Sequence, residues 1–187
     1  MASVVLTGDT SGQVTLSAPA IAGTNTITLP AATGTAELIG VGTAVASTSG
    51  TAIDFTSIPS WAKRITVVFN EVSTSGSSVI LVQIGAGTTP ETTGYISTSV
   101  GGGATNSTTG YCIRNTAAAS SVSGLMTLVG IGSGIWISSH ATKVAVSDAP
   151  TGGGSKTITG TLGVVRITTT NGTDTFDAGS INILYEG

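Results

Sequence analysis

Few residues of this chain could carry out acid–base, nucleophilic or metal chemistry. The sequence holds one histidine, His140, one cysteine, Cys112, and nine acidic residues. A nucleophile generally needs a positioned base, and a zinc site usually draws on several His, Cys or carboxylate ligands. Most familiar catalytic constellations therefore cannot be assembled within one chain, although carboxylate pairs and sites shared between chains remain open. We expect no enzymatic activity, no metal and no cofactor.

The residues that invite a catalytic or metal-binding interpretation also have simpler structural ones. Asp174 and Asp177 flank Phe176 and could suggest a Ca²⁺ site, but two positions supply too few oxygen ligands, so we expect carboxylates that cap a turn. His140 follows two serines at an expected strand break, which favours a loop or a trimer contact. Cys112 is expected to be a small buried residue of a strand. A glycoside hydrolase needs two carboxylates close together, and the scattered acids offer no obvious pair.

Charge excludes two classes of partner. Six Lys and Arg stand against nine Asp and Glu, which gives a net charge of −3. Nucleic-acid binding and polybasic membrane anchoring both need a cationic face, and six scattered cations cannot supply one. No uninterrupted apolar run approaches the roughly 20 residues of a membrane-spanning helix, and the N-terminus does not have the pattern of a secretory signal. We therefore expect no nucleic-acid partner and no membrane partner. The initial Met1 predicts a complete gene product.

Composition favours an all-β fold. Thr, Ser and Gly account for 84 of the 187 residues, yet the hydrophobic fraction is 40% and the charged fraction only 8%, which is not the balance of a disordered chain. β-branched residues favour strands, Gly and Ser interrupt helices, and apolar residues alternate with polar ones along much of the chain. A surface with so few charges is expected to be covered with hydroxyl groups and, in part, with copies of the same chain.

Strand length divides the chain near residue 40. Short strands are expected at 13–17 and 26–29, in a segment punctuated by Gly and Pro, and such strands cannot close a core alone. Longer strands are expected at 64–72, 78–84, 124–131, 134–138, 142–146, 163–169 and 180–185. We therefore predict a β stalk over residues 1–40, followed by an antiparallel β-sandwich knob, jelly-roll-like, over residues 41–187.

Turns and loops of the knob are predicted from Gly and Asn. Asn171-Gly172 between two apolar runs indicates a two-residue hairpin, because both central positions need a positive φ. The triple-glycine segments 101–103 and 152–154 are expected to be flexible loops. Residues 115–121 have no apolar stripe and no cap, so a loop is expected there rather than a helix.

The stalk has apolar residues that a single chain does not bury. Four of them alternate with hydroxyl residues on the two short strands: Val14, Leu16, Ile27 and Leu29. Three chains wound around one axis would turn these residues inward and protect the strand edges. The alternative is an ordinary edge strand packed on the sandwich. At the N-terminus, Val4, Val5 and Leu6 would form an apolar tip in three copies, which predicts a docking surface for an underlying protein.

Two stretches resemble structural proteins of tailed bacteriophages. Residues 8–35, beginning Gly-Asp-Thr-Ser-Gly-Gln-Val-Thr-Leu, resemble a short module of fibre and decoration proteins. Residues 58–70, Ile-Pro-Ser-Trp-Ala-Lys-Arg and onward, look like the opening of a fibre-tip knob, and the likeness continues at 82–85, 93–95 and 178–182. Large tail fibres usually carry an N-terminal adaptor before such modules, whereas this chain begins directly with the stalk.

The resemblance implies a non-enzymatic structural protein on the surface of a virion. Two roles compete: a homotrimeric capsid decoration (cement) protein, and a short fibre, each docked through its N-terminal stalk on the major capsid protein or a tail protein. The alternative is a tail-fibre receptor-binding protein whose knob recognises a carbohydrate or protein of the host surface. Tyrosines and glycine-rich loops adapt well to partners, so contacts with a ligand or host are expected at Tyr95, Tyr111, Gly102 and Gly153. Trp61 is expected either to anchor the core or to contact another subunit.

Overall fold

The structure is a computed structural model that describes residues 3–8, 11–17, 38–115, 117–118, 120–144 and 148–187. The chain divides into two compact units, Met1–Ala36 and Glu37–Gly187. The described residues contain no helix, and every strand pair is antiparallel, which confirms the predicted all-β fold. Accordingly, no described segment is a helix long and apolar enough to cross a membrane.

The N-terminal unit contains a two-stranded hairpin. Strands β1 (Ser3–Thr7) and β2 (Gln13–Ser17) pair with each other, with Val4 opposite Leu16 and Leu6 opposite Val14. Gly12 has a positive φ of 85° at the turn, and the Gly8 amide donates to the Gly12 carbonyl at 3.0 Å. The second predicted stalk strand, with Ile27 and Leu29, lies outside the described residues.

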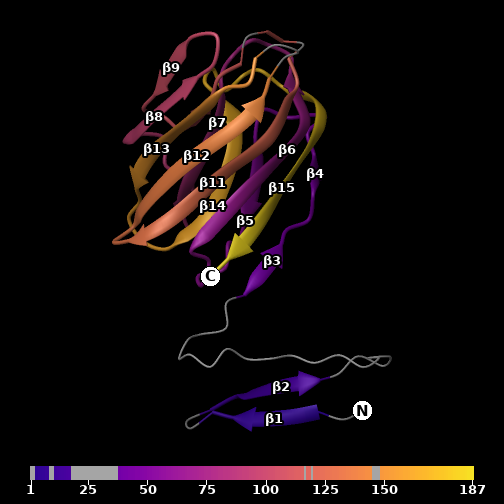
Figure 1. Cartoon of the computed structure of the whole chain (residues 1–187), viewed down its shortest axis with the longest axis vertical. Helices are drawn as coiled ribbons and strands as arrows, with labels where there is room; N and C mark the ends of the chain where they lie inside the picture. The colour runs from indigo at the N-terminus through magenta and orange to yellow at the C-terminus, as the bar shows by residue number, and fades with distance from the viewer. Residues whose placement is uncertain (1–2, 9–10, 18–37, 116, 119, 145–147) are drawn as a thin grey trace. The chain divides into compact units, whose positions relative to one another are not determined.

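The C-terminal unit is built from two sheets, which face each other in Figure 1. The larger sheet has nine strands: β3 (Ile39–Val41), β4 (Val45–Ala46), β6 (Arg64–Thr74), β8 (Tyr95–Val100), β9 (Ala104–Ser107), β11 (Val122–Gly132), β12 (Ile135–Lys143), β13 (Thr151–Thr157) and β15 (Phe176–Glu186). Its order is β3-β15-β6-β11-β12-β13-β8-β9, and β4 also pairs with β15. The smaller sheet, in the order β10-β7-β14-β5, has four strands: β5 (Ile53–Thr56), β7 (Ile80–Ala86), β10 (Tyr111–Ile113) and β14 (Leu162–Thr169).

Alternate residues of both sheets form one hydrophobic core. On β6, Ile65, Val67 and Phe69 point inward and are almost fully buried, while the residues between them lie on the other face. Val165 and Ile167 of β14 enter the same core from the smaller sheet. Trp61 is partly buried and packs against this core, as the core-anchor interpretation predicts. The predicted β-sandwich is therefore confirmed.

The predicted hairpin at Asn171-Gly172 is wrong, although the turn itself is present. Gly172 has a φ of 67°, and its amide donates to the Thr169 carbonyl at 3.1 Å. The strands on either side, however, belong to different sheets, since β14 pairs with β5 and β7 and β15 pairs with strands of the larger sheet. Both edges of β14 are already occupied, so the turn carries the chain across the sandwich instead of folding it back on itself.

Two other predicted boundaries are corrected. The expected strands 134–138 and 142–146 are replaced by one strand, β12, that ends at Lys143. The expected loop at 152–154 is the middle of β13, paired with β12 on one side and β8 on the other. Glycine fits there because a Cβ at Gly152 would lie 2.2 Å from the Thr98 carbonyl oxygen and 2.5 Å from Cε1 of His140. The other triple glycine, 101–103, does connect two strands, β8 and β9.

Candidate functional site

Strand β1 of the N-terminal unit exposes apolar side chains. The exposed fractions of its Val4, Val5 and Leu6 are 59%, 48% and 56%. Two of the residues predicted to dock on a particle lie opposite two of those predicted to face a trimer axis, with Val4 opposite Leu16 and Leu6 opposite Val14. An isolated two-stranded hairpin is marginally stable in water. The described hairpin by itself would therefore gain stability from a further surface to pack against. We do not predict from the sequence that residues 3–7 pair with residues 13–17. The Val-Val-Leu run, followed by Gly8 and Gly12, is the pattern that indicates this hairpin.

The two tyrosines predicted to contact a ligand are buried. Tyr95 is 1% exposed and Tyr111 is 0% exposed, and their rings meet edge to face with centroids 5.1 Å apart. Burial raises the pKa of both phenols, and each hydroxyl is hydrogen-bonded inside the protein. The ligand prediction is therefore not supported for these rings. Gly153 is likewise a residue of a central strand and not of a loop, whereas Gly102 lies in an exposed turn with its amide 3.2 Å from Oδ1 of Asp148.

Tyr95 holds an irregular part of β7 in place. Its hydroxyl oxygen accepts a 2.7 Å hydrogen bond from the Ile84 amide, and its proton faces the Glu91 carbonyl at 2.9 Å. The Tyr95→Phe variant leaves this buried amide without that acceptor, so we expect the free energy of unfolding to fall by about 2 kcal/mol. Urea denaturation followed by circular dichroism would measure it. The control, Tyr111→Phe, removes one bond to the Trp136 carbonyl and should cost about 1 kcal/mol.

His140 forms the centre of a buried polar cluster between β12 and β8. The prediction of a loop or trimer-contact histidine is wrong, because His140 lies within β12 and points inward, and it is only 6% exposed. Its Nε2 lies 3.0 Å from Oγ of Ser99, which also accepts the Arg114 amide at 3.0 Å. Among the described residues, its Nδ1 has no hydrogen-bond partner. Burial lowers the pKa of His140 from 6.5 to about 4, so the imidazole is neutral at pH 7.

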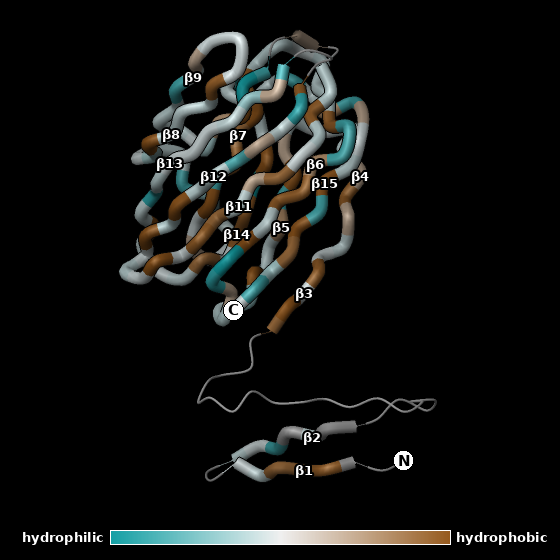
Figure 2. Tube along the Cα trace, in the orientation of Figure 1, coloured by the Kyte–Doolittle hydropathy of each residue, from teal (hydrophilic) through white to brown (hydrophobic). Residues whose placement is uncertain are grey.

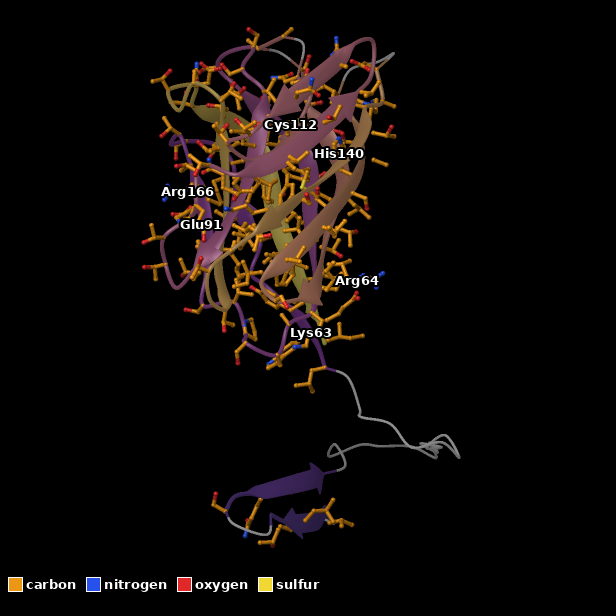
Figure 3. The ribbon with its side chains drawn as sticks, turned by 90° about the vertical axis from the view of Figure 1, so that its left-hand side faces the viewer. Lys63, Arg64, Glu91, Cys112, His140 and Arg166 are labelled. Carbon is orange, nitrogen blue, oxygen red and sulfur yellow. The ribbon has the colours of Figure 1, made fainter. Side chains whose placement is uncertain are left out.

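The arrangement of Ser99 and His140 is half of a nucleophilic site without access to a substrate. A neutral imidazole beside a hydroxyl is the pairing that activates a serine, but an activated serine also needs a third group to orient the base and an open path to the substrate. Ser99 is fully buried and His140 nearly so. In this conformation the pair serves to satisfy polar groups inside the sandwich. Figure 3 places His140 near Cys112, at the end of the sandwich opposite Lys63 and Arg64.

Cys112 is the small buried strand residue that was predicted. It lies in β10, and its Sγ is 3.4 Å from both Oγ of Ser97 and the carbonyl oxygen of Thr105. Burial raises the pKa of the thiol. Because the thiolate is the reactive form, this environment keeps Cys112 chemically inert at neutral pH.

The two acidic residues near the β14–β15 connection accept hydrogen bonds from groups of neighbouring segments. Asp174 accepts the Ser78 amide at 3.1 Å and the Asn171 side-chain amide at 2.6 Å, and these hydrogen bonds lower its pKa. Asp177 accepts the hydroxyl of Ser73. Within the described part of the chain, no group of three or more His, Cys, Asp or Glu residues could hold a metal ion. Asp174 is therefore the turn-capping carboxylate that the sequence predicted, whereas Asp177 lies within β15 and bonds to a neighbouring side chain.

Comparison with known proteins adds no function to this geometry. No protein-family model, curated protein or solved structure matches the chain. The exposed apolar strand β1 is therefore the feature of the described residues that points most directly to a function.

Proposed function

We propose that this chain is a non-enzymatic structural protein of a bacteriophage virion surface, a homotrimeric capsid decoration protein or a short fibre. The observation that carries the proposal is the exposed apolar strand β1, with Val4, Val5 and Leu6 each about half exposed in a five-residue strand. Exposed apolar patches of this kind mark sites that another protein covers. The sequence resembles phage fibre and decoration proteins, which supports a phage particle as the partner that covers β1.

The charge distribution of the C-terminal unit fits a structural role. Its ion pairs join strands or loops of the same unit, as in Arg166 with Asp54 and Arg114 with Asp148. The ionisable residues are thus used to connect elements of the fold. Tyr95 and Tyr111, the two rings predicted to contact a host ligand, are buried, which favours docking over receptor recognition.

The expected result of removing residues 1–7 is loss of the protein from particles. This deletion takes away β1 with its apolar side chains, while the C-terminal unit keeps every strand of its two sheets. Particles of the encoding phage that lack the protein would be mixed with the intact or the shortened chain, and bound copies counted by quantitative mass spectrometry. Cryo-electron microscopy of decorated particles would then show whether the bound copies lie on the capsid or on the tail.

A point variant tests the apolar character of the strand directly. Leu6→Asp replaces one apolar side chain of β1 with a carboxylate, while Gln13→Asp puts the same charge at the turn end of the hairpin, opposite Thr7. Leu6→Asp should lose at least about tenfold in affinity for particles, the equivalent of about 1.4 kcal/mol, and Gln13→Asp should bind normally. Normal occupancy by both Leu6→Asp and the shortened chain would show that β1 is not the attachment surface.

A further inference from the structure

The outward face of the larger sheet has a regular pattern across five neighbouring strands, β6, β11, β12, β13 and β8. Residues directly opposite each other in paired strands lie on the same face. The registers give three rows on this face: Val68, Leu125, Ala141, Thr151 and Val100; then Thr66, Thr127, Ser139, Gly153 and Thr98; then Arg64, Val129, Ile137, Ser155 and Ile96. We call these fifteen residues the outer face.

The outer face consists of a hydroxyl-rich row between two mainly aliphatic rows. The middle row contains only Thr, Ser and Gly, and the aliphatic rows expose large side chains, among them Leu125 at 50%, Ile137 at 40% and Ile96 at 75%. Figure 2 shows hydrophobic stretches along β11 and β12, two neighbouring strands of this surface. Gly153 adds no side chain to the middle row, which lets a second surface approach closely.

The outer face is nearly free of charge. Among its fifteen residues the one ionised side chain is Arg64, which stands at the edge and is paired with Glu186 of β15 at 2.8 Å. The exposed Lys143 lies just beyond the first row on β12. The opposite side of the sandwich differs, because Arg166 there forms a two-bond contact with Asp54, both bonds 2.7 Å long, and Thr56 is exposed beside it. A strongly acidic or basic partner would find no complementary charge on the outer face.

The pattern is self-complementary. A symmetry axis that runs parallel to the strands keeps each row at its own height, so the rows of neighbouring copies meet the same rows. Aliphatic residues then face aliphatic residues, and hydroxyls face hydroxyls. Five strands spaced by about 4.8 Å and three rows spaced by about 6.8 Å cover roughly 500 Å² in projection. That is the same order as the about 800 Å² of accessible surface per partner in a stable interface.

We infer that the outer face of the larger sheet is an interface between copies of this chain, arranged around an axis parallel to its strands. The inference rests on the homotrimer of the proposed function and assigns the surface by which the C-terminal units associate. It explains why a face with exposed Leu, Ile and Val side chains has almost no charge to keep it in water.

Thiol labelling of the full chain tests the assignment. Ser139→Cys places a thiol in the centre of the outer face, and Thr56→Cys places one on the opposite side of the sandwich. The two variants are matched, because Ser139 and Thr56 are both exposed hydroxyl residues of strands. The native Cys112 is buried and reports unfolding in both variants. The concentration is first chosen so that native mass spectrometry detects an oligomer. Maleimide should then label Ser139→Cys at least about tenfold more slowly than Thr56→Cys. The difference should disappear when the protein is diluted until it is monomeric.

The outcomes separate this inference from the virion proposal. Equal labelling rates in a chain whose mass is that of a trimer would overturn the outer-face interface and leave a trimer held by other surfaces. A monomer at all concentrations would overturn both the interface and the trimer. Protection of Ser139→Cys in a chain that does not bind particles would support the interface and reject the virion role. Should Ser139→Cys fail to fold, Thr127→Cys, opposite it on β11, replaces it.

Discussion

The free energy of unfolding of the sandwich is expected to fall by about 3 kcal/mol through His140 alone when the pH is lowered from 7 to 4. Burial lowers the pKa of His140 from 6.5 to about 4. Between pH 6.5 and about pH 4, His140 binds a proton in the unfolded chain but not in the folded chain. Stability therefore decreases as the pH falls through this window, and this contribution levels off below about pH 4, where both states are protonated.

The measurement compares the chain with its His140→Gln variant in urea at pH 7, 5.5 and 4.5. Glutamine retains a polar group near Ser99 and does not titrate. Carboxylates with lowered pKa values, such as Glu91 and Asp174, also make stability depend on pH, but they are common to both proteins and cancel in the difference. The two stability curves should converge at low pH. Parallel curves would mean that His140 has its ordinary pKa in the folded protein.

The Gly152→Ala variant is expected to lose about 3 kcal/mol of stability or more. The added Cβ would lie 2.2 Å from the Thr98 carbonyl oxygen and 2.8 Å from the Ser99 Cα, and both are backbone atoms of β8 that cannot move without breaking the sheet. Overpacking of a well-packed site commonly costs about 1–3 kcal/mol, and contact with rigid backbone places this case at the upper end. Thermal and urea unfolding would measure the loss.

Gly102→Ala is the matched control. The same methyl group there would have its nearest neighbours in the Arg114 guanidinium at 3.8 Å, and the turn is exposed. Its stability should stay within about 0.5 kcal/mol of the original chain. If both variants were equally stable, β13 would have to lie farther from β8 than the structure places it.

The sequence predicts the strands better than it predicts their partners. Alternation at 64–72 is a local property, and β6 forms there as expected. Pairing is a property of distant segments, so the Asn171-Gly172 turn was assigned to a hairpin although its strands belong to two sheets. The glycines 152–154 have the composition of a loop, and only the closeness of β8 and β12 explains their place within a strand.

For the candidate sites, too, the sequence predicts local properties and does not predict contacts between distant segments. The apolar character of Val4, Val5 and Leu6 is visible in the sequence, and their exposure in β1 agrees with it. The three rows of the outer face could not be predicted, because they depend on the registers of five strands that span residues 64–157. Tyr95 and Tyr111 were interpreted as surface residues because aromatic rings suit recognition, whereas their rings fill the interior of the sandwich.

The position of β15 has a consequence for synthesis of the protein. This strand lies between β6 and the short strands β3 and β4, yet it follows all of them in the chain. From Thr74 to Phe176 a ribosome adds about 100 residues, which takes roughly 5–20 s. During that time β6 can pair with β11 on one side only, and its other edge stays open to neighbouring nascent chains. The larger sheet is therefore completed only late in translation, and chains interrupted within β15 should be captured by chaperones or aggregate through β6.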